Sequence, residues 1–337
     1  MRQSKRFAMV APIAVTAWLA GPPATWTQES SALGLLPKMP IPADNQQTDA
    51  KVELGTMLFF DPRLSKGNTI SCASCHNPET GWADARQFSI GVGGERGGRQ
   101  APTVLNTGYQ PFQFWDGRAS SLEEQVLGSI QNPIEMAETL PNVVMKLSAV
   151  PEYKKRFKEV FGTEASTEGI VRAIAAFERT VVSANSAYDK YLTGDKAVLS
   201  EAAVRGLGLF TGKAGCEGCH NGPNFTDNRF HNIGVPQVGP LKEDIGLYAE
   251  TKQELDRMKF KTPTLRSVAL TAPYMHDGVF KTLDEVIEFY NQGGEEVPGK
   301  DLAMKPLDLT DQEKNDLVEF LKALTGESLK INVPKLP

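Results

Sequence analysis

The sequence lacks the features that several classes of protein need. Its net charge is only −5, so nothing in the charge points to nucleic acid or an anionic membrane as a partner. Beyond the N-terminus, no apolar run is long enough to span a bilayer. No segment alternates polar and apolar residues as a half-buried strand does. With a length of 337 residues, these absences favour an all-α protein of two domains.

Cysteine and histidine are also scarce, with four of each, and residues 72–76 (CASCH) and 216–220 (CEGCH) hold every cysteine. Cys-x-x-Cys-His is the attachment signature of c-type haem, in which two thiols add to the haem vinyl groups and the histidine reaches the iron. One zinc site of four thiolates, or two disulfides, would not need a histidine after the second cysteine in both copies. The motifs predict two covalently bound haem c groups, with proximal ligands His76 and His220 and attachment through Cys72, Cys75, Cys216 and Cys219.

The N-terminus has the pattern of a signal peptide. Basic Arg2, Lys5 and Arg6 precede an apolar run over residues 7–20, and a Gly-Pro-Pro break follows. We expect residues 1–28 to be a signal peptide, the alternative being an uncleaved anchor. Export to the periplasm agrees with the haem motifs, because c-type haem is attached outside the cytoplasm.

Apolar periodicity and helix-start signals predict the helices. They fall over residues 51–60, 121–131, 141–149, 152–161, 167–192, 282–292 and 310–326, and residues 200–210 lead into the second haem motif. Three of them open with a capping box, at Ser121, Thr282 and Thr310. The longest, 167–192, is expected to pack in the core and to link two lobes.

The second half of the sequence repeats the first. Residues 102–104, 116–117 and 121–124 match 263–265, 277–278 and 282–285, each 161 positions later. The two haem motifs are only 144 positions apart, so the second copy carries 17 extra residues, which we place near 232–257. We therefore predict two cytochrome c-like domains, 29–185 and 186–337, with one haem each. Trp115 in the first copy stands where His276 stands in the second.

The distribution of histidines predicts that the two haem irons differ in their distal ligands. No histidine lies between His76 and His220, so the first half offers only Met136, Met145, a tyrosine, a carboxylate or water as a distal ligand. The second half has several strong candidates: His231, His276, Met258, Met275 and Met304. A vacant distal position allows chemistry and a filled one favours electron transfer. We expect the first iron to be open and the second closed.

The chain resembles bacterial di-haem cytochrome c peroxidases and the related MauG-like di-haem enzymes, from about Leu54 to Gly326. The resemblance rests on CASCH at 72–76, APTVLN at 101–106, FWDGR at 114–118, TPTLR at 262–266 and APYMHDG at 272–278. It implies two cytochrome c lobes, a calcium ion between them, and peroxide reduction at the first haem. Electrons would enter at the second haem, which His220 binds.

Carried onto this sequence, the resemblance assigns further roles. Glu135 stands where the family has its distal acid–base glutamate, with Gln125 as the nearby distal glutamine. Trp115 matches the tryptophan between the haems. The resemblance places calcium at Gln100, Thr271 and Pro273, the last two through their carbonyls, and Gln100 replaces the usual asparagine. We interpret Trp82 as a core aromatic, and His231 and His276 as hydrogen-bonding partners of haem propionates or backbone.

One departure from the family pattern concerns the first iron. Peroxidases that need reductive activation carry a histidine in the loop after the first motif, and here Val92 stands in its place. Valine cannot bind iron, so the first haem is expected to rest open, as in MauG-like members. For the second haem, Met304 is our first choice of distal ligand, with Met275 and Tyr290 as alternatives.

The expected function is a periplasmic di-haem peroxidase that reduces hydrogen peroxide to water without reductive activation. Its electron donor would be a small cytochrome c or a cupredoxin, and Glu135 would move the protons. The alternative is a MauG-like enzyme that oxidises side chains of a partner protein. A plain two-haem electron carrier is disfavoured, because the first half lacks a strong distal ligand. The resemblance also leaves a homodimer open.

Overall fold

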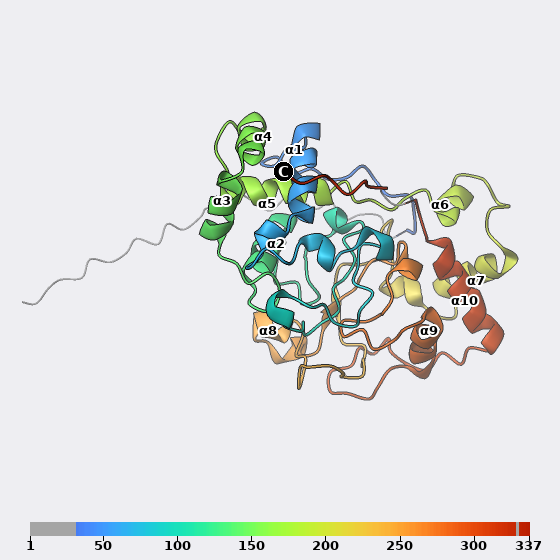
Figure 1. Ribbon diagram of the computed structural model, residues 1–337. Helices are drawn as coiled ribbons and strands as arrows, with labels where there is room; N and C mark the ends of the chain where they lie inside the picture. The colour runs from blue at the N-terminus through green and yellow to red at the C-terminus, as the bar shows by residue number, and fades with distance from the viewer. Residues whose placement is uncertain (1–31, 328–329) are drawn as a thin grey trace, which may run out of the picture.

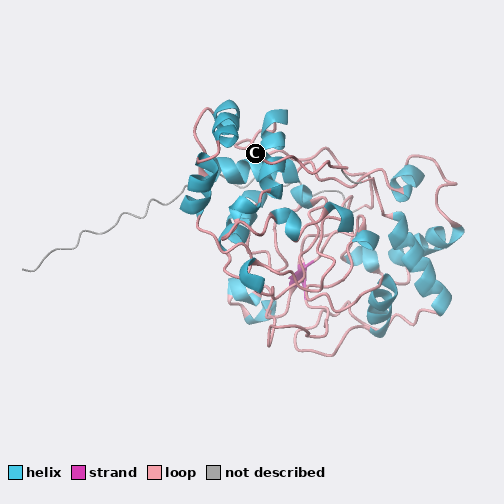
Figure 2. Cartoon of the chain, in the orientation of Figure 1, coloured by secondary structure: helices cyan, strands magenta, loops and turns pink. Residues whose placement is uncertain are grey.

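The structure, a computed structural model, describes residues 32–327 and 330–337. The predicted signal peptide, residues 1–28, lies outside them. The described chain is helix-rich, with long irregular connections and one pair of two-residue strands (Figures 1 and 2). The helices are α1 Asp49–Phe60, α2 Leu122–Gln131, α3 Leu140–Ser148, α4 Pro151–Phe161, α5 Thr167–Glu178, α6 Ala187–Leu192, α7 Glu201–Thr211, α8 Tyr248–Thr251, α9 Leu283–Gln292 and α10 Asp311–Ala323.

The helix-start signals predicted most of the helices, but not every capping box forms in full. Six of the seven predicted helices form and begin within two residues of the expected position. The boxes at Thr282 and Thr310 are complete. The box at Ser121 is only half formed: Ser121 caps α2, but the Glu124 carboxylate accepts from the N–H and hydroxyl of Ser120 instead.

The prediction of one helix over 167–192 was wrong, because α5 and α6 are separate. Between them the backbone of residues 181–183 pairs with Asn106 from the first half. Asn106 N–H donates to Val181 O at 3.0 Å, and the Asn106 amide exchanges hydrogen bonds with Ser183 at 2.9 and 3.1 Å. These bonds satisfy the backbone groups that a continuous helix would have used. A new capping box at Ser186 then starts α6.

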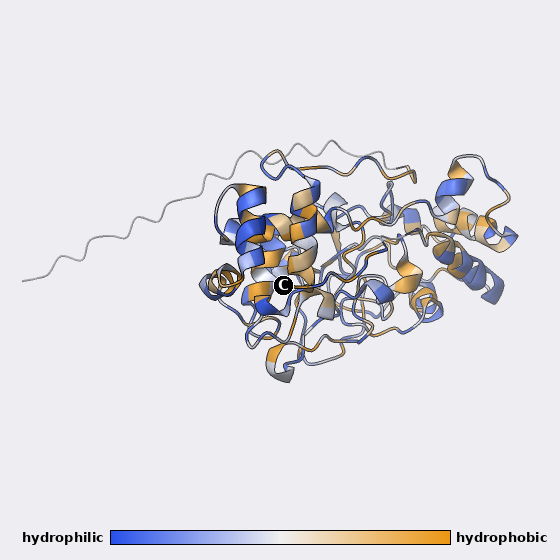
Figure 3. Ribbon diagram, turned by 45° about the horizontal axis from the view of Figure 1, so that its top comes forward, coloured by the Kyte–Doolittle hydropathy of each residue, from blue (hydrophilic) through white to orange (hydrophobic). Residues whose placement is uncertain are grey.

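Two helix pairs each build a hydrophobic core. In the first half α1 crosses α5 at Gly55, where an added Cβ would lie 1.9 Å from Ala173 O. In the second half α7 crosses α10 at Gly206, where an added Cβ would lie 2.0 Å from Asp316 O. Figure 1 places α1 and α3–α5 at one end of the molecule and α6, α7, α9 and α10 at the other. Hydrophobic and hydrophilic residues share the same helices, as expected when one face packs inward (Figure 3).

The sequence repeat is also a structural repeat. Helices α2 and α9 have the same length and lie 161 positions apart. The isolated bridge between Gln113 and Ala119 recurs at the same offset between Tyr274 and Phe280. Turns repeat as well, since Phe114 and its counterpart Met275 both have positive φ, of 64° and 71°. Positions 161 residues apart are therefore equivalent in space over this part of the chain.

The extra residues of the second half form a long connection between the two strands. Strand β1 (Phe230–His231) pairs antiparallel with β2 (Phe260–Lys261), and residues 232–259 connect them, including α8. This agrees with the insertion expected near 232–257. Arg99 of the first half binds this connection. It donates to both carboxylate oxygens of Asp244 at 2.7 Å and also forms an ion pair with Asp116.

The two ends of the described chain pack on opposite halves. Leu33 contacts the second core, and the Gly34 carbonyl accepts from Arg266 at 2.9 Å. Ile331 and Leu336 contact the first core. The division of the chain into 29–185 and 186–337 stays a prediction. Within residues 32–327 and 330–337, no helix combines the length and apolar character needed to cross a membrane.

Candidate haem sites

The two cysteine motifs adopt the same short turn. A 3₁₀ turn covers Cys72–Ser74 in the first and Cys216–Gly218 in the second. The N–H of the following histidine donates to the first cysteine's carbonyl at 2.9 Å in both copies. Both motifs therefore form one compact backbone turn, and attachment to a single haem requires the two cysteines and the histidine to lie on such a turn.

The alternatives to haem do not fit this arrangement. All four thiols are free, so the motifs form no disulfides. Among the described residues, the one cluster of potential metal ligands within reach of each other contains Cys219, Asp227 and His231, with no second thiol. The four cysteines therefore do not converge on a single zinc ion.

His220 is oriented to bind a metal from the cavity beside it. Its Nδ1–H donates to Phe225 O at 3.1 Å, which fixes the tautomer and leaves the Nε2 lone pair free. Burial lowers its pKa, and burial likewise lowers the pKa of His76. Both imidazoles are therefore neutral near pH 7, which is the form that binds iron.

A large apolar cavity surrounds the second motif. Its wall contains Cys216, Cys219 and His220 together with Leu283, Leu317 and Leu321. The three candidate distal ligands Met275, Tyr290 and Met304 all lie on this wall. An apolar cavity that holds two thiols and an oriented neutral histidine fits a c-type haem. The choice among the three distal candidates stays a prediction, with Met304 first.

Glu135 lies beside the first motif. After burial, which is the main cause, its negative charge contributes to raising the pKa of both Cys72 and Cys75. Burial also raises the pKa of Glu135 itself, while hydrogen bonds from Ser129 and Asn132 and the charge of Arg118 oppose the shift. The fold thus brings a carboxylate with a raised pKa to the first haem site, although 59 positions separate it from His76.

Neighbouring polar side chains hold Glu135 in place. Asn132 Nδ2 donates to Glu135 Oε1 at 2.6 Å. Gln125 does not bind Glu135 directly; its Nε2 donates to Ser129 Oγ at 2.9 Å, and Ser129 is one of the groups that oppose the rise in the pKa of Glu135. Sequence reasoning missed Ser129 and Asn132. The signal for Ser129 was available, because it occupies the repeat position of Tyr290.

The loop that contains Val92 packs against the backbone of Glu135. Val92 N–H donates to Glu135 O at 2.8 Å, and an added Cβ at Gly91 would lie 2.9 Å from Glu135 Cα. The loop is therefore fixed next to the acid–base candidate. Its residue at the position of the family's capping histidine has no group that binds iron.

Trp115 and His276, which are repeat counterparts, both bind the backbone of Gln100. The Trp115 indole donates to Gln100 O at 2.8 Å, and Gln100 N–H donates to His276 O at 2.8 Å. Trp115 also lies on the wall of the second cavity. The predicted calcium residues Gln100, Thr271 and Pro273 all line the second cavity, and their role as calcium ligands stays a prediction. The Gln100 amide N–H₂ donates to Asp84 O at 3.2 Å.

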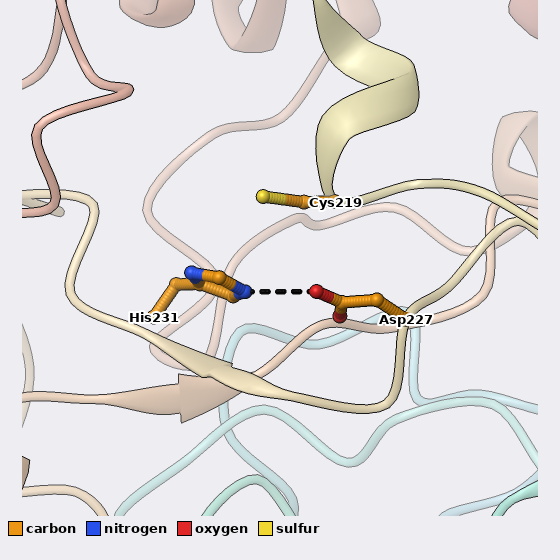
Figure 4. A group of neighbouring side chains, drawn as sticks. All are labelled: Cys219, Asp227 and His231. Carbon is orange, nitrogen blue, oxygen red and sulfur yellow. Dashed lines mark hydrogen bonds and ion pairs between the residues drawn. The ribbon is translucent and has the colours of Figure 1, made fainter. Parts of the chain in front are cut away.

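His231 is held by two carboxylates, of which Figure 4 shows Asp227. Its Nε2 donates to Asp227 at 3.0 Å and its Nδ1 to Asp301 at 2.7 Å. The hydrogen bond to Asp227 is the main cause that raises its pKa, to about 11. With both nitrogens engaged and Cys219 part of a haem motif, this cluster is not a separate metal site.

Trp82 and Glu178 are both buried. Trp82 is fully buried and packs edge-on against Phe59, so the interpretation as a core aromatic is confirmed. Glu178, at the end of α5, was not singled out in the sequence although it is an acidic residue in an apolar stripe. It is only 5% exposed, its Oε2 has no hydrogen-bonding partner, and burial raises its pKa to about 8.

Comparison with known proteins gives a consistent result. The sequence profile of the family described as di-haem cytochrome c peroxidase matches residues 49–197. The cytochrome-c peroxidase IdrP1 of Denitromonas iodatirespirans is 42% identical, over 90% of this chain and 89% of its own length. The methylamine utilization protein MauG of Methylorubrum extorquens is also 42% identical, over 89% of this chain and 85% of its own.

A solved structure agrees with these relatives. A MauG-like protein associated with microbial copper homeostasis superposes with a TM-score of 0.81 at 36% identity, covering 87% of this chain and 95% of that one. The likeness thus extends over most of the chain. The chain belongs to the di-haem cytochrome c peroxidase family, which includes the MauG proteins.

Proposed function

We propose that this protein is a periplasmic peroxidase that reduces hydrogen peroxide to two waters, using two electrons from a small redox protein and two protons. The observation that carries the proposal is the position of Glu135. A carboxylate with a raised pKa lies beside a haem motif in the half of the chain that has no further histidine. The donor would be a small cytochrome c or a cupredoxin.

The residues divide the work between two sites. Cys72, Cys75 and His76 would hold one haem, and Cys216, Cys219 and His220 the other. Bound haem would supply a redox-active iron at each site. The Glu135 carboxylate takes the first proton from hydrogen peroxide and returns it to the leaving oxygen. A pKa raised by burial suits the first step, because it makes the carboxylate a stronger base toward the proton of hydrogen peroxide.

Electrons would reach the first site through the region between the two halves. Trp115 lies on the wall of the second cavity, and Lys261 N–H donates to its carbonyl at 2.8 Å. The bond from the Trp115 indole to Gln100 fixes the orientation of the ring. We propose Trp115 as the relay, and a calcium ion at Gln100, Thr271 and Pro273 as a brace for this region.

The first test is to mix the oxidised protein, as isolated, with hydrogen peroxide and a pre-reduced small cytochrome c. Fast donor oxidation from the first mixing, with no reductant to prime the enzyme, is expected if Val92 leaves the first iron open. A lag that only prior reduction removes would refute this part of the proposal. Glu135→Gln keeps the shape of the side chain but removes the base, so turnover is expected to fall by about 10²- to 10⁴-fold.

The MauG-like role is the second candidate, and Tyr290 favours it. This phenol lies on the wall of the second cavity, and its neighbourhood is apolar enough for burial to raise its pKa. MauG-like proteins use a tyrosine as the distal ligand of this haem. In the mixing experiment this role predicts a spectral change on adding peroxide that persists with little donor oxidation. No spectral change and no turnover would instead indicate a plain electron carrier.

A further inference from the structure

His231 joins two segments of chain that border the second cavity. Its Nε2 donates to Asp227 at 3.0 Å (Figure 4), and its Nδ1 donates to Asp301 at 2.7 Å. Because an ionised carboxylate can only accept, both ring nitrogens donate and the imidazole is cationic. The side chains of His231 and Asp227 are only 19% and 10% exposed, so water competes little for the bond between them. Charge-assisted bonds of this kind are about twice as strong as neutral ones, and His231 is therefore a firm link.

The first of the two segments belongs to the haem attachment motif. Asp227 N–H donates to the carbonyl of Cys219 at 2.8 Å, and Cys219 precedes the proximal ligand candidate His220. The second oxygen of the Asp227 carboxylate accepts from Arg229 N–H at 2.9 Å, which fixes the orientation of the carboxylate. One end of the link through His231 is thus anchored to the motif.

The second segment carries Met304, the first candidate for the distal ligand. Asp301 forms a tight turn here, because its carbonyl accepts from Met304 N–H at 3.0 Å and its Oδ1 accepts from Ala303 N–H at 3.0 Å. Its other carboxylate oxygen, Oδ2, binds His231. Ala303 and Met304 both lie on the wall of the second cavity. The other end of the link is therefore the turn that orients Met304.

Little apolar packing holds the segment that carries Met304. Every residue over 294–308 is at least partly exposed, and Leu302 is 96% exposed. Asp301 N–H donates to Asn232 O at 2.8 Å, which pairs the turn with the residue that follows His231. Segments with few buried apolar contacts open at a low cost in free energy. The polar contacts to His231 and its neighbour are therefore an important part of what keeps this segment in place.

The corresponding aspartate of the first half is bound in another way. Asp84 corresponds to Asp227, and its carboxylate accepts from Arg86 and Ser89, both of which lie within five positions of it along the chain. Phe88 precedes His231 by the same 143 positions by which Asp84 precedes Asp227. A phenylalanine ring cannot link two carboxylates. The two halves thus differ at this position in the same sense as their expected distal ligands, open in the first and closed in the second.

We propose that His231 is a positioning residue of the second haem site: by linking Asp227 to Asp301, it holds the turn that carries Met304 at the cavity and keeps the distal position of the second iron filled. This inference rests on the proposed function, in which the second haem accepts electrons with Met304 as its distal ligand. A thioether ligand raises the reduction potential of a haem. The link through His231 therefore helps to maintain the potential at which this site accepts electrons.

Two variants break the link from opposite ends. His231→Phe keeps a flat ring and removes both donors. Asp301→Ala removes the acceptor and leaves the backbone bonds of the turn, so it decides the question if His231→Phe does not take up haem. Glu296→Ala is the matched control, because it removes a carboxylate from the same segment that is 90% exposed and paired only with Lys300 of that segment.

The measurements are made on the protein with both haems attached. Amide hydrogen exchange over residues 294–304 is expected to become at least about tenfold faster in His231→Phe and Asp301→Ala, because a charge-assisted bond no longer opposes opening of the segment. The oxidised second haem is expected to gain high-spin absorption, and its reduction potential is expected to fall. Glu296→Ala is expected to match the native protein in exchange, spectrum and potential.

Two results would overturn the inference. The first is native exchange over residues 294–304 in both variants, which would show that the link does not hold the segment. The second is faster exchange with an unchanged spectrum and potential of the second haem, which would show that the segment does not hold the distal ligand.

The proposed function and this inference fail in different ways. If the native protein does not oxidise any donor with hydrogen peroxide, the proposed function fails, while exchange and potential still decide the role of His231. If the native protein is an active peroxidase and both variants match it in exchange, spectrum and potential, only the inference about His231 fails.

Discussion

Gly206→Ala, compared with Gly208→Ala on the same helix, tests the tight helix crossing that supports the second haem site. At Gly206 an added methyl carbon would lie 2.0 Å from Asp316 O, and ordinary contact starts at 3.4 Å. Helix α10 would have to move by about 1.4 Å, because the obstacle is backbone and not a flexible side chain. Nothing lies within 4 Å of a methyl added at Gly208, which is exposed.

The two substitutions therefore have opposite expected effects. Both gain about 1 kcal/mol because alanine favours helix more than glycine does. At Gly206 this gain is outweighed by overpacking, which costs about 3 kcal/mol or more against backbone. The net loss in the free energy of unfolding is about 2 kcal/mol. If the second half of the chain unfolds as one unit, this lowers its melting temperature by about 4–8 °C, whereas Gly208→Ala is expected to melt slightly higher.

The assay is thermal unfolding followed by far-ultraviolet circular dichroism, with haem absorbance recorded on the same samples. The haem signal adds a test of location, since Leu321 of α10 lines the second cavity and the second haem spectrum is expected to change before the first. If Gly206→Ala and Gly208→Ala melt at the same temperature, the crossing is not as tight as described and the reasoning is refuted.

Three further predictions concern charges and ligands. Arg99→Met leaves the buried carboxylate of Asp244 without its arginine partner, while Asp116 keeps Arg118, so unfolding in urea should show a loss of about 3 kcal/mol, and a loss below about 1 kcal/mol would contradict this. The pKa of Glu178 is raised to about 8 from 4.5, so between these pH values the folded protein retains a proton that the unfolded chain loses, and stability should fall as the pH rises from 4.5 to 8. In Glu178→Gln, this decline in melting temperature with pH should shrink. An equal decline in the variant would show that another group is responsible. Met304→Ala should convert the oxidised second haem from low to high spin, while Tyr290→Phe should leave its absorption spectrum unchanged. The reverse result would show that Tyr290, and not Met304, is the distal ligand.

Much of the helical framework was predictable because its signals are local. Helix starts depend on a side chain that caps the backbone a few residues later, so Thr282 and Thr310 could be found from the sequence. The break between α5 and α6 could not, because it depends on Asn106, which lies far away in the chain and binds residues 181–183. A continuous apolar stripe does not show which backbone groups will be bonded by a distant residue.

Some features of the haem sites were likewise predictable from the sequence, and others were not. The sequence by itself determined the two attachment motifs, the absence of a second histidine in the first half and the repeat that relates the halves, because each depends on residue identity and spacing alone. Only the tertiary structure decided that Glu135 lies beside the first motif and that the terminal segments pack on opposite cores. Those contacts join residues whose separation along the chain has no fixed period, so they form only when helices and loops from different parts of the chain pack together.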